Sequence, residues 1–192
     1  MCEYIKVNPN PKVEKLFGFE AYCKWMGITK PNANSLTSYN SGDVKGRFIE
    51  AVLEQTEGTS RKITENQNTP YFDLIRNGKK VESKSTSTNV TSPSQQKYNT
   101  NYLQIGGLLS KKYGCDEIII TDAVNFRWFC IPHDDFFNKF KLIDVWKNQS
   151  ELIDYRLVWF TDYNPNKYFK NGNYRSPYLS HNTKLITNYE VF

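Results

Sequence analysis

Apolar residues recur at helical spacing in two segments near the start of the chain. The first segment is residues 11–27, and Gly27 ends it. The second is residues 46–55, where Phe48 and Val52 lie one turn apart. The polar residues 28–44 between the two segments predict a linker. In the first helix the apolar positions are Val13, Leu16, Phe17, Tyr22 and Trp25.

The centre of the chain has the pattern of β-strands. Residues 61–65, 71–75 and 80–86 each predict a strand. Asn77-Gly78 separates the second strand from the third, and this dipeptide is the strongest short signal for a hairpin turn. A two-residue turn at that point pairs positions whose numbers add to 155, as 77 and 78 do.

The later elements predict a second layer and a buried strand. Residues 102–113 have apolar positions that predict a helix ending at Gly114, and the almost continuously apolar residues 115–121 predict a strand buried on both faces. Further along, the chain predicts a strand over 126–131, a helix over 133–140 and a strand over 155–160. This order predicts an α/β (α+β) fold with a mixed central β-sheet flanked by helices.

The length and composition fit one domain over residues 1–192, with a C-terminal extension at 150–192. Hydrophobic residues make up 39% of the chain, which excludes wholesale disorder. No apolar run reaches the roughly 18 residues that a membrane span needs, and the N-terminus lacks a signal-peptide pattern. We therefore expect a cytoplasmic protein with no membrane partner.

Charge and cysteine content narrow the candidate chemistry. The net charge of +5 favours a polyanionic partner. The four cysteines include no C-x-x-C pair, and the chain has only two histidines, which argues against a zinc cluster. We expect the cysteines to be free thiols.

The predicted hairpin concentrates charge on one face. In the expected register Asp73 lies opposite Glu82, with Cβ atoms about 5 Å apart. Lys84 shares the face of Glu82, whereas Leu74 and Val81 occupy the other face and pack on the core. Two facing carboxylates repel each other, and a hard divalent cation such as Mg²⁺ relieves that repulsion. The alternative is a solvated cross-strand charge cluster without a metal.

These residues resemble a known family. Pro70-Tyr71-Phe72-Asp73, followed after a spacer by Glu82-Ser83-Lys84, resembles the motif of the PD-(D/E)XK nucleases, with the proline displaced from its usual place beside the aspartate. The resemblance covers roughly residues 46–131, and it implies that this range is a catalytic αβββαβ core of the restriction-endonuclease type with Mg²⁺-dependent cleavage of phosphodiesters. It also implies that Asp73 and Glu82 ligate the metal and that Lys84 is the catalytic lysine.

The same resemblance extends to the helix before the hairpin. Gly46-x-x-x-Glu50 resembles the segment in which many members carry an acidic residue near the metal. Glu50 is therefore expected as a further metal ligand and catalytic residue, with Glu54 as the substitute. An exposed helical glutamate without a function is the alternative for Glu50.

The polar loop after the motif suggests a way to read DNA. Amide side chains are suited to adenine, and lysine is suited to phosphate or guanine. The expected DNA-binding residues are Asn89, Gln95, Gln96, Lys97 and Asn99. A flexible polar loop without contacts to DNA is the alternative.

We expect a Mg²⁺-dependent, sequence-specific endonuclease of double-stranded DNA that resembles a Type II restriction enzyme. Cutting both strands of a symmetric site favours a homodimer, and the aromatic helix at residues 11–27 is the candidate interface. One alternative is another nuclease on the same fold, of the homing, repair or junction type. A second alternative is a non-catalytic DNA-binding module.

Overall fold

The computed structural model describes residues 11–29, 32–40, 42–61, 71–85, 102–123, 126–160, 169–170, 173–174, 185–186 and 188–189. Its N-terminal part contains the helices α1 (Pro11–Phe17), α2 (Phe19–Trp25), α3 (Ala33–Asn40) and α4 (Gly42–Leu53). The predicted helices at 11–27 and 46–55 are both present, but the first is broken and the second begins four residues earlier than the sequence predicts.

Gly18 divides the first predicted helix into α1 and α2. Its backbone is extended, with φ −66° and ψ 164°. A Cβ atom at this position would lie 2.6 Å from the carbonyl oxygen of Glu14, which is closer than real Cβ contacts. The chain therefore needs glycine to turn between the two helices. Gly27, with φ +70°, ends α2 as predicted.

The expected linker at residues 28–44 instead contains α3 and the start of α4. Asn32 caps α3, because its Oδ1 accepts hydrogen bonds from the Ser35 backbone N–H at 2.9 Å and from the Ser35 hydroxyl at 3.1 Å. Tyr39 is buried, and its hydroxyl donates to the Phe17 carbonyl at 2.9 Å. The polar composition of this stretch therefore supplies a helix cap, and the linker prediction was wrong.

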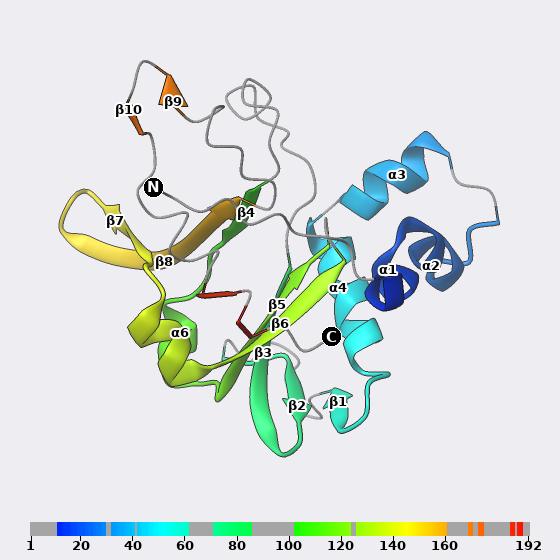
Figure 1. The fold of residues 1–192 in the computed structure, drawn as a ribbon, viewed down its shortest axis with the longest axis horizontal. Coiled ribbons are helices and arrows are strands. Elements are labelled where there is room, and N and C mark those ends of the chain that lie inside the picture. The colour runs from blue at the N-terminus through cyan, green and yellow to red at the C-terminus, as the bar shows by residue number, and fades with distance from the viewer. Residues whose placement is uncertain are drawn as a thin grey trace.

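A five-stranded sheet forms the centre of the molecule (Figure 1). Its strand order is β1-β2-β3-β5-β6, and β3 runs parallel to β5 while the other neighbours are antiparallel. The predicted fold class, a mixed central sheet flanked by helices, is confirmed. The strands are β1 (Thr59–Arg61), β2 (Leu74–Arg76), β3 (Lys79–Ser85), β5 (Glu117–Asp122) and β6 (Arg127–Pro132).

The β2–β3 hairpin has the predicted turn and register. Asn77 and Gly78 have φ values of 50° and 79°, as a tight two-residue turn that follows the twist of the strands requires. Leu74 pairs with Val81, and Arg76 pairs with Lys79. The predicted strand pairing is therefore confirmed for the residues that lie within both strands.

Both faces of the sheet are covered. Leu74, Val81 and Ile119 pack in one apolar cluster with side chains of the N-terminal helices. Ile118 and Ile120 belong to a second cluster on the opposite face. Figure 1 shows α1–α4 on one side of the sheet and α6 (His133–Lys139) with further strands on the other. The face of β3 that carries Glu82 is therefore covered as well, and Glu82 is buried.

The described residues 102–113 do not form the predicted helix. Residues 102–113 contain β4 (Tyr102–Ile105) and the 3-10 helix η1 (Ser110–Tyr113), which ends at Gly114. Gly107, with φ +70°, separates the two elements, because this backbone conformation interrupts a helix. The αβββαβ order of the central sheet thus carries a strand and one 3-10 turn where its second helix was expected.

A smaller sheet has the strand order β4-β8-β7, with β7 at Ile143–Lys147 and β8 at Glu151–Phe160. Two short strands, β9 (Phe169–Lys170) and β10 (Asn173–Tyr174), pair with each other. Leu157 and Ile186 are fully buried in the second apolar cluster. The segment expected as a C-terminal extension therefore builds part of the core.

Two further expectations concern the cysteines and the membrane. Cys23, Cys115 and Cys130 are free, as predicted. Burial raises the pKa of Cys115 to about 11, and burial together with the carboxylate of Glu117 raises that of Cys130 to about 12. Within the described part of the chain, no helix combines the length and the apolar character that crossing a membrane requires.

A pair of glycine substitutions tests this packing. A Cβ atom at Gly114 would lie 2.2 Å from the Cβ of Tyr71, whereas one at Gly46 in α4 has open space. Gly114→Ala is expected to destabilise the fold by about 1–3 kcal/mol through overpacking. The control Gly46→Ala is expected to stabilise it by about 0.5–1 kcal/mol. Urea unfolding measures both, and equal effects would contradict the contact between Tyr71 and Gly114.

Candidate functional site

The candidate site begins on β3, which carries Glu82 and Lys84 on one face. In the parallel ladder with β5 these residues lie beside Ile118 and Ile120, the apolar residues of the second cluster. Glu82 is only 1% exposed, and Lys84 places its Nζ 2.6 Å from Oε1 of that carboxylate. The predicted glutamate and lysine are therefore adjacent, but they lie within the protein.

A second lysine completes the charge balance. Lys111 of η1 places its Nζ 2.7 Å from Oε2 of Glu82, so each oxygen of the carboxylate faces one ammonium group. The side chain of Lys111 is 10% exposed and that of Lys84 is 23% exposed. A buried carboxylate requires such partners, because an unpaired charge in the interior is strongly unfavourable.

Asp73 lies one residue before β2, where the ladder of the hairpin has ended. Its backbone N–H donates to the Val81 carbonyl at 2.9 Å, and its Oδ2 accepts from the Ser83 N–H at 3.0 Å. The predicted direct pairing with Glu82 is thus replaced by a contact with the two flanking residues. Because Ser83 follows Glu82 in the chain, this bond keeps the carboxylate of Asp73 near that of Glu82, and its negative charge raises the pKa of Glu82.

The surroundings raise the pKa of Glu82 above its ordinary value. Desolvation by burial is the main cause, and Lys84 opposes it. The negative charge of Asp73 raises the pKa further, whereas the nearby ammonium groups of Lys84 and Lys111 lower it. The site therefore contains two carboxylates and two ammonium groups, and water solvates the carboxylate of Glu82 poorly.

A short ledge of backbone lies beside the site. We use this name for residues 106–109, which connect β4 to η1. Asp154 of β8 holds the ledge, because its carboxylate accepts hydrogen bonds from the N–H groups of Gly107 at 2.8 Å, Leu108 at 2.9 Å and Leu109 at 3.3 Å. A Cβ atom at Gly107 would lie 3.8 Å from Nζ of Lys84. The ledge thus passes directly beside the site.

Glu50 is not assembled with the other acids into a three-ligand site. It lies half-buried on α4, a helix that contacts β3 and whose neighbouring residue Ile49 packs in the first apolar cluster. Among the described residues, no three His, Cys, Asp or Glu side chains gather as a metal site would require. Glu50, Asp73 and Glu82 therefore do not form one.

The predicted DNA-reading residues Asn89, Gln95, Gln96, Lys97 and Asn99 lie outside the described residues. Their contacts with DNA stay a prediction.

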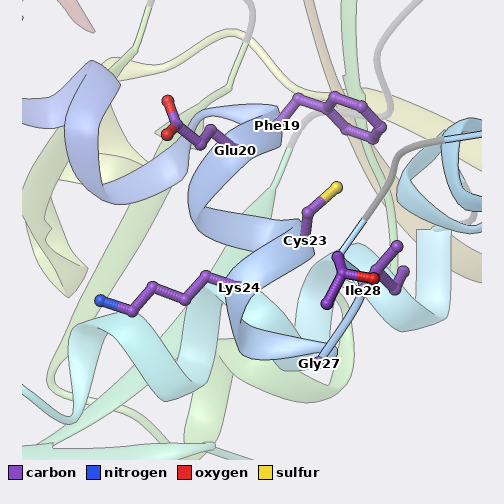
Figure 2. A pocket seen from close by; sticks show the side chains of 7 residues that line it. Phe19, Glu20, Cys23, Lys24, Gly27 and Ile28 are labelled. Carbon is purple, nitrogen blue, oxygen red and sulfur yellow. The ribbon is translucent and has the colours of Figure 1, made fainter.

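A groove lies elsewhere, beside α2 (Figure 2). Phe19, Cys23 and Ile28 line it together with Gly27. Figure 2 shows the side chains of Phe19, Cys23 and Ile28 on one side of the helix and that of Lys24 extending away from them. The groove has a volume of about 620 Å³ and includes none of the predicted catalytic residues. Glu20, Lys24 and Thr29 also line it, so its lining is partly apolar and partly polar.

Comparison of the chain with family models, curated proteins and solved structures yields no match. The chemical argument for this site therefore depends on its own residues.

The donor set suits a hard cation such as Mg²⁺. Asp73 and Glu82 supply two neighbouring carboxylates, and Mg²⁺ is commonly bound by one or two carboxylates with water and phosphate oxygens in its other positions. Both oxygens of Glu82 are paired with lysines in the structure. Asp73 and Glu82 would hold the metal, and an ammonium group would have to move to make room for it.

Sequence reasoning missed Lys111 and Asp154. Lys111 lies in a segment whose apolar spacing predicts a helix, and nothing in that spacing indicates a partner on β3. Asp154 lies in a strand of alternating character. The Gly106-Gly107 pair was the available signal, since two adjacent glycines weaken a helix and permit close backbone approach.

Two substitutions of Asp73 separate its charge from its hydrogen bond. Asp73→Asn keeps an oxygen that can accept from Ser83 and removes the repulsion with Glu82, so the fold should be as stable as the wild type or slightly more stable at pH 7.5. Asp73→Ala loses the acceptor and should cost about 1 kcal/mol. Chemical denaturation compares them, and marked unfolding of Asp73→Asn would show that the charge of Asp73 stabilises the fold instead.

The same variant predicts a pH effect. Because the pKa of Glu82 is raised in the folded state, its contribution to stability falls as pH rises from about the ordinary value of 4.5 through the folded pKa. Asp73→Asn lowers that folded pKa and should reduce the decline. Denaturation midpoints measured between pH 4 and pH 8 should show a smaller decline in Asp73→Asn than in the wild type, and parallel curves would contradict the prediction.

Proposed function

We propose that the chain is a Mg²⁺-dependent endonuclease that hydrolyses phosphodiester bonds of double-stranded DNA, similar to the PD-(D/E)XK nucleases and most like a Type II restriction enzyme. The observation that carries the proposal is the Glu82–Lys84 pair on β3, with Nζ 2.6 Å from Oε1, and Asp73, which lies one residue before β2 and accepts a hydrogen bond from Ser83. A mixed sheet in which β3 lies parallel to β5 supports the resemblance.

Each residue has a distinct role in this chemistry. Asp73 and Glu82 would hold Mg²⁺, and the chemistry that this metal would supply is polarisation of the phosphoryl group and a lower pKa for a water. The water oxygen would bond to phosphorus as one phosphorus–oxygen ester bond breaks, the attacking water would lose a proton to solvent, and the leaving sugar oxygen would take up a proton from solvent. Lys84 orients the attacking water, and its positive charge offsets the negative charge that develops on the phosphoryl oxygens. The net charge of +5 favours attraction of the DNA backbone.

A homodimer belongs to this proposal, because cutting both strands of a symmetric site uses two sites related by a two-fold axis. The end of α2 supports it with two adjacent exposed apolar residues, Trp25 and Met26, each 44% exposed. The groove beside α2 adjoins them through Lys24 and Gly27. This surface is our candidate for the interface between the two copies.

A non-catalytic DNA-binding module is the second candidate. The observation that favours it is the pairing of both Glu82 oxygens with lysines, which gives the carboxylate a role in stability without a metal. Failure of the wild type to cut any DNA with Mg²⁺ or Mn²⁺ would support this second function.

Digestion of a sequenced plasmid or phage genome, followed by mapping of the ends, tests the nuclease. The wild type is expected to cut at a short symmetric sequence with Mg²⁺ and not with EDTA. Lys84→Ala and Glu82→Gln should each lower the cleavage rate by about 100-fold or more. Lys80→Ala is the control, since Lys80 is exposed on the same strand and its ammonium lies over the Phe72 ring. Full cleavage by both site variants would place catalysis elsewhere.

Mapping on mismatched and branched DNA separates restriction from the repair and junction alternatives. A short symmetric recognition site is the outcome that a restriction enzyme requires.

The interface has its own test. Met26→Lys should shift the chain from dimer to monomer in sedimentation velocity, because a charge on a desolvated apolar surface is costly. Ile153→Lys is the matched control, since Ile153 is similarly exposed at 47% but lies on β8. A dimer that both variants retain would exclude this surface, as would a wild type that is monomeric.

A further inference from the structure

Lys111 is an unexpected component of the site. The motif that the sequence resembles supplies Asp73, Glu82 and Lys84, and these three carry the proposed chemistry. Lys111 comes from η1, which lies between β4 and β5 in the chain, and its Nζ lies 2.7 Å from the carboxylate of Glu82. Its side chain is 10% exposed, which makes it the more buried of the two lysines.

The backbone around Lys111 is firmly held. The carboxylate of Asp154 accepts hydrogen bonds from the N–H groups of Gly107, Leu108 and Leu109, which immediately precede η1. Leu108 is fully buried in the second apolar cluster. The position of the Lys111 backbone is thus fixed from a different sheet, and the ammonium group leaves Glu82 only by a rotation of its own side chain.

A metal on Glu82 conflicts with this ammonium. Mg²⁺ binds oxygen ligands at about 2.0–2.1 Å. An ammonium group 2.7 Å from the same carboxylate would lie close to the metal, and two like charges repel strongly at such a distance. The ammonium of Lys84 lies similarly close to the other oxygen, at 2.6 Å, but the proposed function uses Lys84 in the reaction, so Lys111 is the group that departs.

We propose that Lys111 is a positioning residue that acts as an internal cation: it occupies the place of the divalent metal on Glu82 and is displaced when the metal binds. The inference rests on the proposed function, in which Glu82 is a metal ligand. The site then contains a counter-ion in both states, an ammonium in the metal-free protein and a metal in the active one. The described geometry that carries it is the triplet of buried Glu82, buried Lys111 and partly exposed Lys84.

The affinity for Mn²⁺ tests the proposal without any cleavage assay. Electron paramagnetic resonance of free Mn²⁺ measures binding to the wild type, Lys111→Gln and Lys112→Gln at pH 7.5. Lys111→Gln should bind Mn²⁺ roughly tenfold more tightly, because it removes a competing charge. Lys112→Gln is the matched control, since this substitution removes the same charge from the neighbouring residue. The ammonium of Lys112 lies over the ring of Tyr155.

Equal affinities of the two variants would overturn the proposal, and so would weaker binding by Lys111→Gln or the absence of Mn²⁺ binding. The wild type gives a second measurement that needs no variant to fold. Acetylation of lysines, read by mass spectrometry, should increase at Lys111 when Mg²⁺ is added while Lys112 stays constant. Unchanged acetylation at Lys111 would also overturn the proposal.

These readouts separate the inference from the proposed function. If the wild type cuts DNA with Mg²⁺ but Lys111→Gln and Lys112→Gln bind Mn²⁺ equally, the role of Lys111 fails and the nuclease stands. If the wild type cuts no DNA but Lys111→Gln binds Mn²⁺ more tightly than Lys112→Gln, the displaced cation stands and the nuclease fails.

Discussion

One buried carboxylate constrains the centre of this protein. Glu82 is 1% exposed on a strand whose neighbours on the same face are isoleucines, and burial alone would make its charge untenable. Two ammonium groups from different elements compensate this charge. Lys84 lies two residues along the same strand, and Lys111 comes from η1. The path of the chain between β3 and β5 is therefore tied to the charge on β3.

This arrangement is costly as a device for stability. Replacing a buried ion pair by apolar residues is often neutral or stabilising, so an ionic triplet in an otherwise apolar cluster is weak evidence that stability is its purpose. Perturbed carboxylates are concentrated at functional sites, although structural networks also perturb them. The neighbouring charge of Asp73 raises the pKa of Glu82 further. This repulsion adds no stability, so a purely structural network would have no use for it.

Local sequence signals predicted the parts of the fold that local physics decides. Asn77-Gly78 determined the turn and register of the hairpin, since both residues adopt positive φ. The apolar run around Ile119 indicated a strand covered on both faces, and every residue of β5 is buried. From that hairpin the adjacency of Glu82 and Lys84 followed directly, because side chains two residues apart on a strand share a face.

Tertiary contacts decided the rest. The stretch around Asn32 is polar enough to predict a linker, yet its asparagine caps α3 and Tyr39 packs against the N-terminal helices. Residues 102–113 show helical spacing, but β4 finds a partner in β8, which lies far along the chain. The burial of Glu82 could not be foreseen either, because the sequence of a hairpin does not reveal what covers its second face.

The carboxylate of Asp154 belongs to β8, whereas the motif residues end at Lys84. The proposed catalytic residues on β3 and the Asp154 carboxylate on β8, which holds the ledge, thus come from two different sheets. In the chain, β5 lies between β3 and β8. A fragment trimmed to residues 46–131 would retain Asp73, Glu82 and Lys84, but it would lose the hydrogen bonds from Asp154 that hold the ledge. The smallest piece of this chain with an intact site must therefore extend beyond the motif to β8. Placing the motif on another scaffold would also require a carboxylate in the position of Asp154.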